Sequence, residues 1–336
     1  MPAIPGEILI FALRLDGKMR KVKEIIKDWM LPAAIVSGVS LYLIYYFTPA
    51  LKPLGPVCGK IVSEGQRLLI AIMLFLQFVR ISPHDLKIRR WHLYAAIFQV
   101  VTSGAIAAII ITTPPGDIRI LLECAMICLI CPTAAAAGVI TDRLDGSLSE
   151  TISYVVIINA IATLFIPTLI TGISPASEIG FWRYVLGIFL KIFPLLIAPC
   201  LLAWFIRYTT HRLQRWLMRY SHWSFYFWFF GLTFAMILAT KALLHSHIGM
   251  GTIFCIVLIS MGSCAIQFYI GQHFAKDHTT KITARQSLGQ KNTGFLIWLG
   301  YTYLTPVTSV AGGLYAIWQN LFNSWELYRH NHGKEF

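Results

Sequence analysis

Long apolar blocks, separated by short polar links, dominate the sequence from residue 31 onwards. A helix that crosses the hydrocarbon core of a bilayer needs about 20 mainly apolar residues, and ten blocks approach that length. The pattern therefore predicts an all-α integral membrane protein with ten transmembrane helices. The expected spans are residues 31–47, 63–79, 91–111, 118–141, 149–173, 181–208, 224–245, 250–274, 283–304 and 306–328.

The two ends of the chain have a different pattern. An apolar stretch at residues 7–15 is too short to cross a bilayer, and a basic run from Lys18 to Lys27 follows it. A cleavable signal peptide has the reverse order, with its charge before the apolar core. Residues 1–30 are therefore expected to form a cytoplasmic amphipathic segment that lies on the inner leaflet. Residues 330–336 are the expected cytoplasmic tail.

The amino-acid composition excludes a soluble enzyme. Hydrophobic residues make up 57% of the 336 residues and charged residues only 13%, whereas a soluble domain usually carries about 25% charged residues. Six of the seven cysteines lie inside apolar blocks, where a free thiol behaves as a small apolar group. Neither a disulfide framework, nor a zinc site, nor any cofactor is therefore expected.

The basic residues predict how the chain is oriented. There are 28 Lys and Arg against 15 Asp and Glu, and the net charge is +13. A nucleic-acid-binding protein would gather this charge on one polar face, but here it lies in the links between apolar blocks. With the N-terminus in the cytoplasm, 20 basic residues fall in cytoplasmic segments and five in external ones. Because cytoplasmic loops are the basic ones, we expect both termini inside a bacterial-type inner membrane, and no nucleic-acid partner.

The ten spans divide into two halves of five. The first five-helix repeat would cover residues 31–173, the link residues 174–180, and the second repeat residues 181–329. An odd number of spans in each half places the second half upside down relative to the first. Inverted repeats of this kind are common in secondary transporters, whose substrates bind where interrupted helices meet near the midplane.

Corresponding spans of the two halves are interrupted. The fourth span contains Cys131-Pro132 followed by small residues up to Gly138, and the ninth contains the sequence SLGQKNTG at residues 287–294. Taken alone, the first interruption could be a kink in a closely packed helix, and the second an ordinary loop between two shorter spans. Their matching positions favour two broken helices that cross each other.

At these residues the chain resembles the bile acid:sodium symporter superfamily. That family carries a Cys-Pro pair followed by small residues in its fourth helix, a Glu-x-Gly-x-Gln-Asn signature in its ninth, and a Trp-x-Asn in its tenth. The matching segments here are Cys131 to Val139, Ser287 to Asn292, and Trp318 to Asn320, and Gln99 matches a glutamine early in the third helix. The resemblance covers residues 31 to about 324, nearly the whole membrane region.

The resemblance implies a fold and an activity. Helices one, two, six and seven would form a panel, and helices three to five and eight to ten a core, with the fourth and ninth helices unwound where they cross. Members of the family mostly move organic anions inward with sodium, from bile acids to small carboxylates, by alternating access.

Most of the family's sodium-binding positions carry other residues in this chain. The carboxylate position of the ninth helix is Ser287 and the glutamine position is Lys291, while the Ser and Asn positions of the fourth helix are Ala137 and Gly138. A polar residue remains at Asn159 in the fifth helix. A hard cation needs several oxygen ligands and compensating negative charge, so sodium coupling is not expected.

Lys291 is expected to take the place of the missing sodium. Its ammonium group could donate hydrogen bonds to Gln99, Asn159 or exposed carbonyls, or it could pair with an anionic substrate. A buried amine could also exchange a proton, so a proton rather than sodium is the expected coupling ion. The alternative is that Lys291 extends to a surface and binds nothing.

Other ionisable groups in the spans are expected to have structural roles. Glu123 should face the external vestibule or pair with a neighbouring cation, and a proton carrier is the alternative. Lys191 and Lys241 should extend to a membrane interface. Because Glu123 is the only acid that this reading places deep in a span, the paired carboxylates or metal set of a membrane enzyme are not expected.

These observations predict a secondary transporter of a small organic solute, with an organic anion preferred, and not an enzyme. One alternative is an arsenite-type efflux carrier of the same fold, with Cys131 as a soft ligand. Another is a membrane receptor that binds without transport. The residues expected to bind substrate or ion are Gln99, Pro132, Thr133, Ala137, Gly138, Asn159, Ser287, Gln290, Lys291 and Asn292.

Overall fold

The computed structural model describes residues 32–174, 180–220, 223–246 and 248–333. The expected N-terminal segment, most of the link and the last three residues of the tail lie outside the described residues. Within these ranges the regular elements are helices, and the only strand-like feature is an isolated bridge. Five of these helices are long and apolar enough to cross a membrane, or six if one bent pair is counted as a single span. The chain is therefore an all-α, multi-pass membrane protein.

Residues 32–47 form the first described helix. The helices that follow are α2 (Gly55–Phe78), α3 (Arg90–Thr112), α4 (Asp117–Ile130), α5 (Ala137–Arg143), α6 (Leu148–Ile173), α7 (Phe181–Leu196), α8 (Ala198–Thr209), α9 (His211–Tyr220), α10 (Ser224–Leu244), α11 (Met250–His273), α12 (His278–Gly289), α13 (Thr293–Tyr303) and α14 (Ser309–Asn331). Short 3-10 turns occupy Pro49–Leu54, Pro83–Asp85 and Pro306–Thr308.

The expected interruptions in the fourth and ninth spans are confirmed. The block at residues 118–141 is divided into α4 and α5, and the block at 283–304 into α12 and α13. Pro132 lies in the first break, where its missing N–H prevents a continuous helical hydrogen-bond pattern. The second break contains no proline, so contacts with other parts of the chain must hold it open.

A further break separates α7 from α8. The sequence pattern predicts a single span over residues 181–208, so this break is an unexpected feature. The two helices are bent by 44° at Ile197. Pro199 is in the first turn of α8 and cannot donate to the carbonyl of the preceding turn. The bend therefore has a local cause in the sequence. Beyond it, α9 is a short surface helix with no buried residues.

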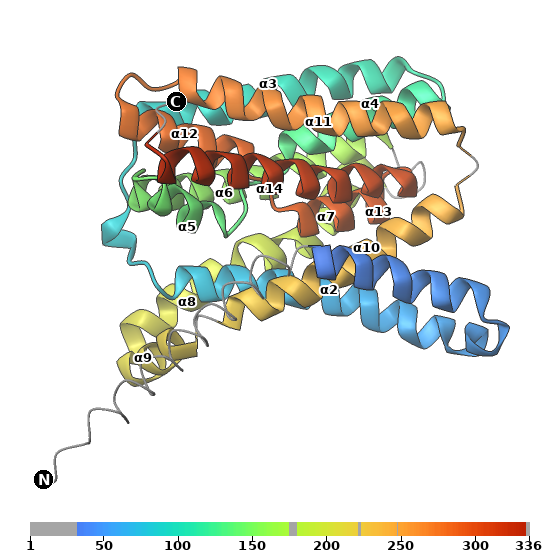
Figure 1. Ribbon diagram of the computed structural model, residues 1–336, viewed down its shortest axis with the longest axis horizontal. Coiled ribbons are helices and arrows are strands. Elements are labelled where there is room, and N and C mark those ends of the chain that lie inside the picture. The colour runs from blue at the N-terminus through green and yellow to red at the C-terminus, as the bar shows by residue number, and fades with distance from the viewer. Residues whose placement is uncertain (1–31, 175–179, 221–222, 247, 334–336) are drawn as a thin grey trace, which may run out of the picture.

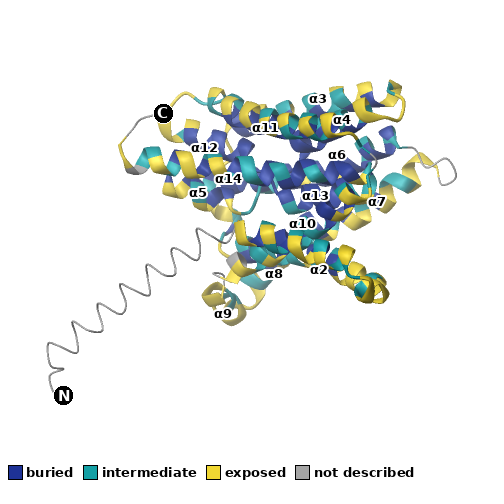
Figure 2. Ribbon diagram, turned by 45° about the vertical axis from the view of Figure 1, so that its right-hand side comes forward, coloured by how far each residue is buried: buried dark blue, intermediate teal, exposed yellow. Residues whose placement is uncertain are grey.

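The helices form two layers, as Figure 1 shows. The smaller layer contains helix 32–47, α2, α8 and α10, and the larger contains α3 to α6 and α11 to α14. Buried residues concentrate in the larger layer, on α6, α13 and α14 (Figure 2). Inside the smaller layer, a Cβ placed on Gly38 would lie 2.6 Å from Met236 Cβ. Helix 32–47 and α10 thus approach closely through a small residue, as is usual for helices in a membrane.

In the larger layer, the backbones of α11 and α12 approach closely at Gly271 of α11. A Cβ placed on Gly271 would lie 2.8 Å from the carbonyl oxygen of Ala284 and from the Cα of Arg285, both in α12. Because these are backbone atoms, they cannot rotate away as a side chain could. The position of α12, and of the break at its end, therefore depends on the absence of a side chain at Gly271.

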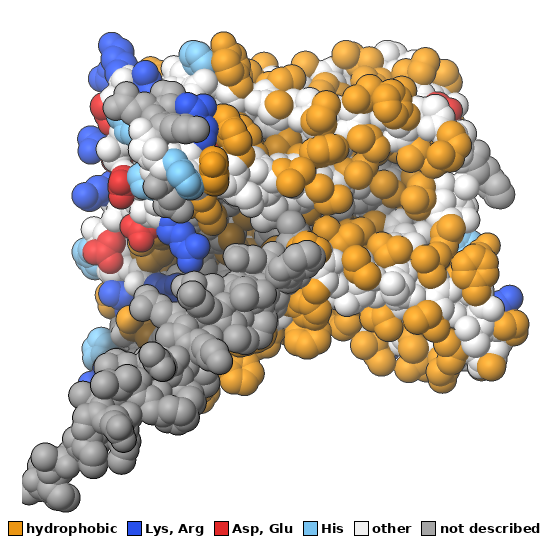
Figure 3. Space-filling model, viewed as in Figure 1, with side chains coloured by type: hydrophobic (Ala, Val, Ile, Leu, Met, Phe, Trp, Pro, Cys, Tyr) orange, Lys and Arg blue, Asp and Glu red, His pale blue; other side chains and the backbone are white. Residues whose placement is uncertain are grey.

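The outer surface separates into an apolar band and a charged end. On the face drawn in Figure 3, apolar side chains cover most of the surface, while Lys, Arg, Asp, Glu and His gather at the end where the C-terminus lies. Large apolar side chains are exposed on successive turns of the outer helices. Examples are Leu93, Ile97 and Val101 on α3 and Phe254, Leu258 and Met261 on α11. A surface of this kind is stable in contact with lipid.

Candidate functional site

The two breaks cross each other at the centre of the larger layer. Thr133 and Lys291 form an antiparallel bridge. The N–H of Ala134 donates to the carbonyl of Gln290 at 3.0 Å, and the N–H of Asn292 donates to the carbonyl of Pro132 at 2.9 Å. Backbone groups that have left their own helices therefore satisfy each other, as unwound backbone buried within a membrane protein must. We call segments 131–136 and 290–292 the crossover.

Side chains strengthen the contact between the two segments. The Thr133 hydroxyl donates to the carbonyl of Ser287 at 2.6 Å, and the Cys131 thiol donates to the carbonyl of Asn292 at 3.1 Å. Both side chains are fully buried. Pro132 and Thr133 therefore act in the crossover through backbone geometry and helix-end contacts.

Gln99 of α3 stabilises the end of α4. Its amide nitrogen donates to the carbonyls of Leu129, at 2.8 Å, and Cys131, at 3.2 Å, which have lost their intrahelical partners. The Gln99 side-chain oxygen accepts from the Tyr154 hydroxyl of α6 at 2.5 Å. The glutamine found from the sequence is thus at the crossover, but its hydrogen-bonding capacity is used by helix carbonyls and a tyrosine.

A second pair of a glutamine and a tyrosine binds helix-end carbonyls from the other half of the chain. The sequence pattern did not predict this pair. Gln267 of α11 donates through its amide nitrogen to the carbonyl of Cys128 and to the Tyr315 hydroxyl, both at 3.0 Å. The Tyr315 hydroxyl of α14 in turn donates to the carbonyl of Gly289, the last residue of α12, at 2.8 Å. A buried glutamine in a lipid-spanning segment was the available signal.

Lys291 has the most unusual environment in the crossover. Its side chain is fully buried, and its Nζ has no hydrogen-bond partner among the described residues. It lies within electrostatic range of the buried thiols of Cys128, Cys131 and Cys264. The amine therefore lies at the crossover, as expected, and the alternative of a surface position is wrong. Among the described residues it forms none of the suggested hydrogen bonds to Gln99, Asn159 or carbonyl groups.

Three other candidate residues, Asn292, Ser287 and Asn159, lie in two kinds of environment. Asn292 is the N-cap of α13, because its side-chain oxygen accepts from the N–H of Phe295 at 3.2 Å. The Ser287 hydroxyl and both side-chain polar atoms of Asn159 are buried and have no hydrogen-bond partner in the part of the chain that the structure describes. They are polar groups that a bound solute or water could satisfy.

Ala137 and Gly138 begin α5 and are buried, but Gly138 does not face the other broken helix. A Cβ placed on Gly138 would lie 2.8 Å from the Leu148 side chain, and its next neighbours belong to Ile152, also of α6. The expectation that small residues up to Gly138 let the two broken helices approach is therefore wrong at this position. Its small size serves the packing of α5 on α6.

A buried ionic cluster that the sequence reading missed lies beside the crossover, between α12 and α14. Arg285 Nη2 and Glu326 Oε1 form an ion pair at 2.7 Å, and both residues are at least 95% buried. The Gln286 amide nitrogen donates to Glu326, and the Gln290 amide nitrogen donates to Gln286. Gln290, predicted to bind substrate or ion, is thus linked to a buried carboxylate. Glu123 is therefore not the only buried acid of the described residues.

Glu123 itself pairs with a neighbouring cation, as expected. Its carboxylate accepts from Arg119 at 3.3 Å, from the N–H of Thr305 at 3.0 Å and from the Thr308 hydroxyl at 3.1 Å. Arg119 and Glu123 line a cavity of about 790 Å³ at the end of the molecule away from the C-terminus. The carboxylate therefore holds the start of α14 against α4.

Lys191 and Lys241 are exposed, and they lie over the rings of Tyr303 and Tyr301, respectively.

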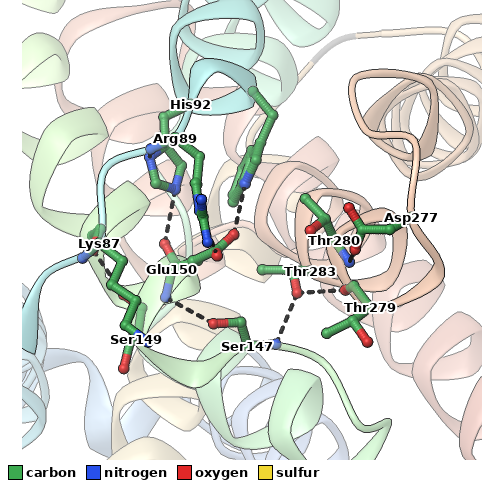
Figure 4. A network of polar contacts seen from close by, with 12 residues as sticks. Lys87, Arg89, His92, Ser147, Ser149, Glu150, Asp277, Thr279, Thr280 and Thr283 are labelled. Carbon is green, nitrogen blue, oxygen red and sulfur yellow. Dashed lines mark hydrogen bonds and ion pairs between the residues drawn. The ribbon is translucent and has the colours of Figure 1, made fainter.

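A polar network closes the opposite, charged end of the larger layer (Figure 4). Glu150 at the start of α6 accepts from Arg89 Nε at 2.9 Å and from Trp91 Nε1 at 3.1 Å. His92 accepts from the N–H of Arg89 through Nδ1 and donates through Nε2 to the carbonyl of Glu150. The neutral ring with its proton on Nε2 fits both contacts. This network fixes the beginning of α3 against the beginning of α6.

The same network extends to α12, as the right-hand part of Figure 4 shows. The Thr283 hydroxyl accepts from the N–H of Ser147 at 2.8 Å. Asp277 caps α12 by accepting from the N–H of Thr280 at 2.9 Å, and this hydrogen bond holds the pKa of Asp277 below its usual value. The network thus anchors the beginnings of α3, α6 and α12 at a distance from the crossover.

Two observations concern disulfides and metal sites. Cys128 and Cys131 are separated by two residues and are free thiols, like every other cysteine that the structure describes. Within the described ranges, no group of three or more His, Cys, Asp or Glu side chains is placed to hold a metal ion.

Comparison with known proteins adds no assignment. No family model matches the chain, and no curated protein matches it.

Proposed function

We propose that this protein is a secondary carrier for a small organic anion, which it moves by alternating access between its two layers. The observation that carries the proposal is the buried, unpartnered amine of Lys291 at the crossing of two broken helices. Among the described residues, an ammonium in this position has neither an ion-pair partner nor a hydrogen bond, which is costly inside a protein. A carboxylate that enters the crossover would relieve that cost. No chemical conversion of the solute is part of the proposal.

We further propose that the chain has ten spans in two inverted repeats. The glutamine and tyrosine pairs support this arrangement, because Gln99 with Tyr154 and Gln267 with Tyr315 come from the third and fifth spans of each half. Each pair binds carbonyls within three residues of the crossover or inside it. Helix 32–47, α2, α8 and α10 would be the panel that resembles the one in the bile acid:sodium symporter superfamily. Gln66 of α2 links it to the crossover by donating to the carbonyl of Gly294 at 2.8 Å.

The function can be tested in two stages. The purified protein is screened by thermal shift against monocarboxylates, dicarboxylates, organic sulfonates, arsenite and choline, because a bound ligand stabilises the folded state by mass action. Any stabilising carboxylate is then tested for uptake into proteoliposomes. Binding without flux would support the receptor alternative. Stabilisation by arsenite alone would support the arsenite carrier, for which the thiols near Lys291 are the relevant feature.

Transport is expected to be independent of sodium. The positions that would supply sodium ligands are Ser287, Ala137 and Gly138, and Asn292 uses its side-chain oxygen as a helix cap. Too few oxygen ligands remain for a hard cation. Initial uptake of the carboxylate should therefore be equal in sodium and choline buffers at one pH and ionic strength. A steep dependence on sodium concentration would show that a sodium site exists in spite of these substitutions.

Both termini are expected to lie in the cytoplasm of a bacterial-type inner membrane. The charged end in Figure 3 carries the C-terminus and most of the visible Lys and Arg, and cytoplasmic loops are the basic ones. A reporter that is active only in the cytoplasm should be active when fused after residue 336 and inactive when fused in the turn at Pro49–Leu54. The reverse pattern would require an odd number of spans or the opposite orientation.

A further inference from the structure

Glu326 is a buried carboxylate in an unusual position for a purely structural group. It is fully buried in α14, and its ion-pair partner Arg285 is 5% exposed in α12. A buried ion pair in a membrane protein seldom adds stability, because desolvation of the charges offsets their attraction. Ionisable groups inside membrane proteins are retained mostly where they carry protons, ions or substrates.

An unbroken set of hydrogen bonds connects Glu326 to the crossover. Glu326 accepts from the amide nitrogen of Gln286, whose side-chain oxygen accepts from the amide nitrogen of Gln290. The backbone carbonyl of Gln290 accepts from the N–H of Ala134. The side-chain amides of Gln286 and Gln290 both donate in the direction of the Glu326 carboxylate. Both oxygens of Glu326 face donors in this arrangement, Arg285 at Oε1 and Gln286 at Oε2. A proton on either oxygen would therefore oppose a donor, so the arrangement fits the ionised carboxylate.

Protonation of Glu326 would change this arrangement in two ways. The carboxyl group would lose its charge attraction to Arg285, which ties α12 to α14. A proton on Oε2 would also oppose the Gln286 amide nitrogen, so the Gln286 amide would turn to offer its oxygen, and the Gln290 amide would turn in response. Protonation would thus loosen α12 and alter the hydrogen bonding of Gln290, which is part of the crossover.

The surroundings of Glu326 leave Arg285 as its charged partner. Among the described residues, Arg285 on α12 is the charged group that the structure places in contact with Glu326. Other charged or titratable groups on the elements packed here are Arg329 and His330 on α14, His273 at the end of α11 and Asp145 in the turn after α5. Arg329 acts on Arg285, His330 pairs with Asp145 at 3.4 Å, and His273 is exposed and bonded to its own helix. From α11, the uncharged Gln272 accepts from Arg285 at 3.4 Å.

We propose that Glu326 is the proton-binding site of this protein, and that Gln286 and Gln290 convey its charge state to the crossover. The coupling of that proton to solute movement rests on the proposed carrier function, whereas proton binding by Glu326 does not. Glu123 and Glu150 are poorer candidates, because each holds helix ends together through backbone or indole N–H donors and has no side-chain path to the crossover.

Infrared spectroscopy of the protein in lipid tests the site directly. A difference spectrum between low and high pH should contain the carbonyl stretch of a buried, protonated carboxyl group, shifted in heavy water. The band should be absent in Glu326→Gln and unchanged in the matched control Glu123→Gln, which removes another buried carboxylate on α4. If Glu326→Gln does not fold, Glu326→Asp must shift the band. A band that survives unshifted in these variants would overturn the proposal.

Transport measurements then separate this inference from the proposed function. With a carboxylate that the wild-type protein transports, Glu326→Gln should still exchange labelled for unlabelled solute across the bilayer. It should no longer accumulate the solute against its gradient when a pH gradient is imposed. Accumulation equal to that of the wild type would refute a coupling role for Glu326. Absence of any flux in the wild type, with the infrared band present, would refute the carrier function and leave the proton site intact.

Discussion

Replacement of Lys291 by Met should abolish anion binding and at the same time stabilise the empty protein. Methionine has nearly the same length and removes only the amine, which is fully buried and has no hydrogen-bond partner among the described residues. Removal of an unpaired polar group from such a site lowers the cost of folding. The melting temperature without ligand should therefore rise or stay unchanged.

The loss of binding follows from the same geometry. If the solute's carboxylate pairs with Lys291, removal of one partner leaves the other buried and unpaired, at a cost of about 3 kcal/mol or more. That corresponds to an increase in Kd of at least about 100-fold, measured by titrating the thermal shift. Lys241→Met is the matched control, because Lys241 is exposed over the ring of Tyr301. Equal affinities of Lys291→Met and the wild type would place the anion elsewhere.

Replacement of Gly271 by Leu should prevent the protein from folding into a single stable form. A Cβ at Gly271 would meet backbone atoms of Ala284 and Arg285 at 2.8 Å, so α11 and α12 would have to move apart. That movement would also disturb the packing of α12 beside the crossover. Gly271→Ala, with the smallest possible addition, should already cost about 1–3 kcal/mol through overpacking.

Gly262 provides a control on the same helix. A Cβ placed on Gly262 meets nothing within 4 Å, so Gly262→Ala should be neutral or slightly stabilising, because alanine favours helices over glycine. Size-exclusion profiles and melting temperatures in detergent distinguish the two positions. Equal melting temperatures for Gly271→Ala and Gly262→Ala would mean that α11 and α12 are not in backbone contact.

The sequence alone was sufficient for the fold class and for the positions of the two breaks. Apolar blocks long enough to span a bilayer, with few charges, leave an all-α membrane protein as the outcome, because every backbone group in lipid must bond within its own helix. Pro132 and the polar segment 287–294 marked the interruptions for the same reason. Both signals are local properties of the sequence. Pro132 lacks a hydrogen-bond donor, and segment 287–294 carries polar side chains that hydrocarbon does not tolerate.

The partners of the interrupted segments could not be predicted in this way. Nothing in the sequence indicated that Asn292 would cap α13, that Gln267 would support Cys128, or that Gly271 rather than Gly138 would lie against the backbone of a broken helix. The pairing of Glu326 with Arg285 depends on how α12 and α14 pack. The period of a helix shows which residues share a face, but it does not show which helix that face meets. Only the tertiary structure brings residues from distant parts of the chain into contact. It alone decided that the amine of Lys291 is buried without a hydrogen-bond partner among the residues that the structure describes.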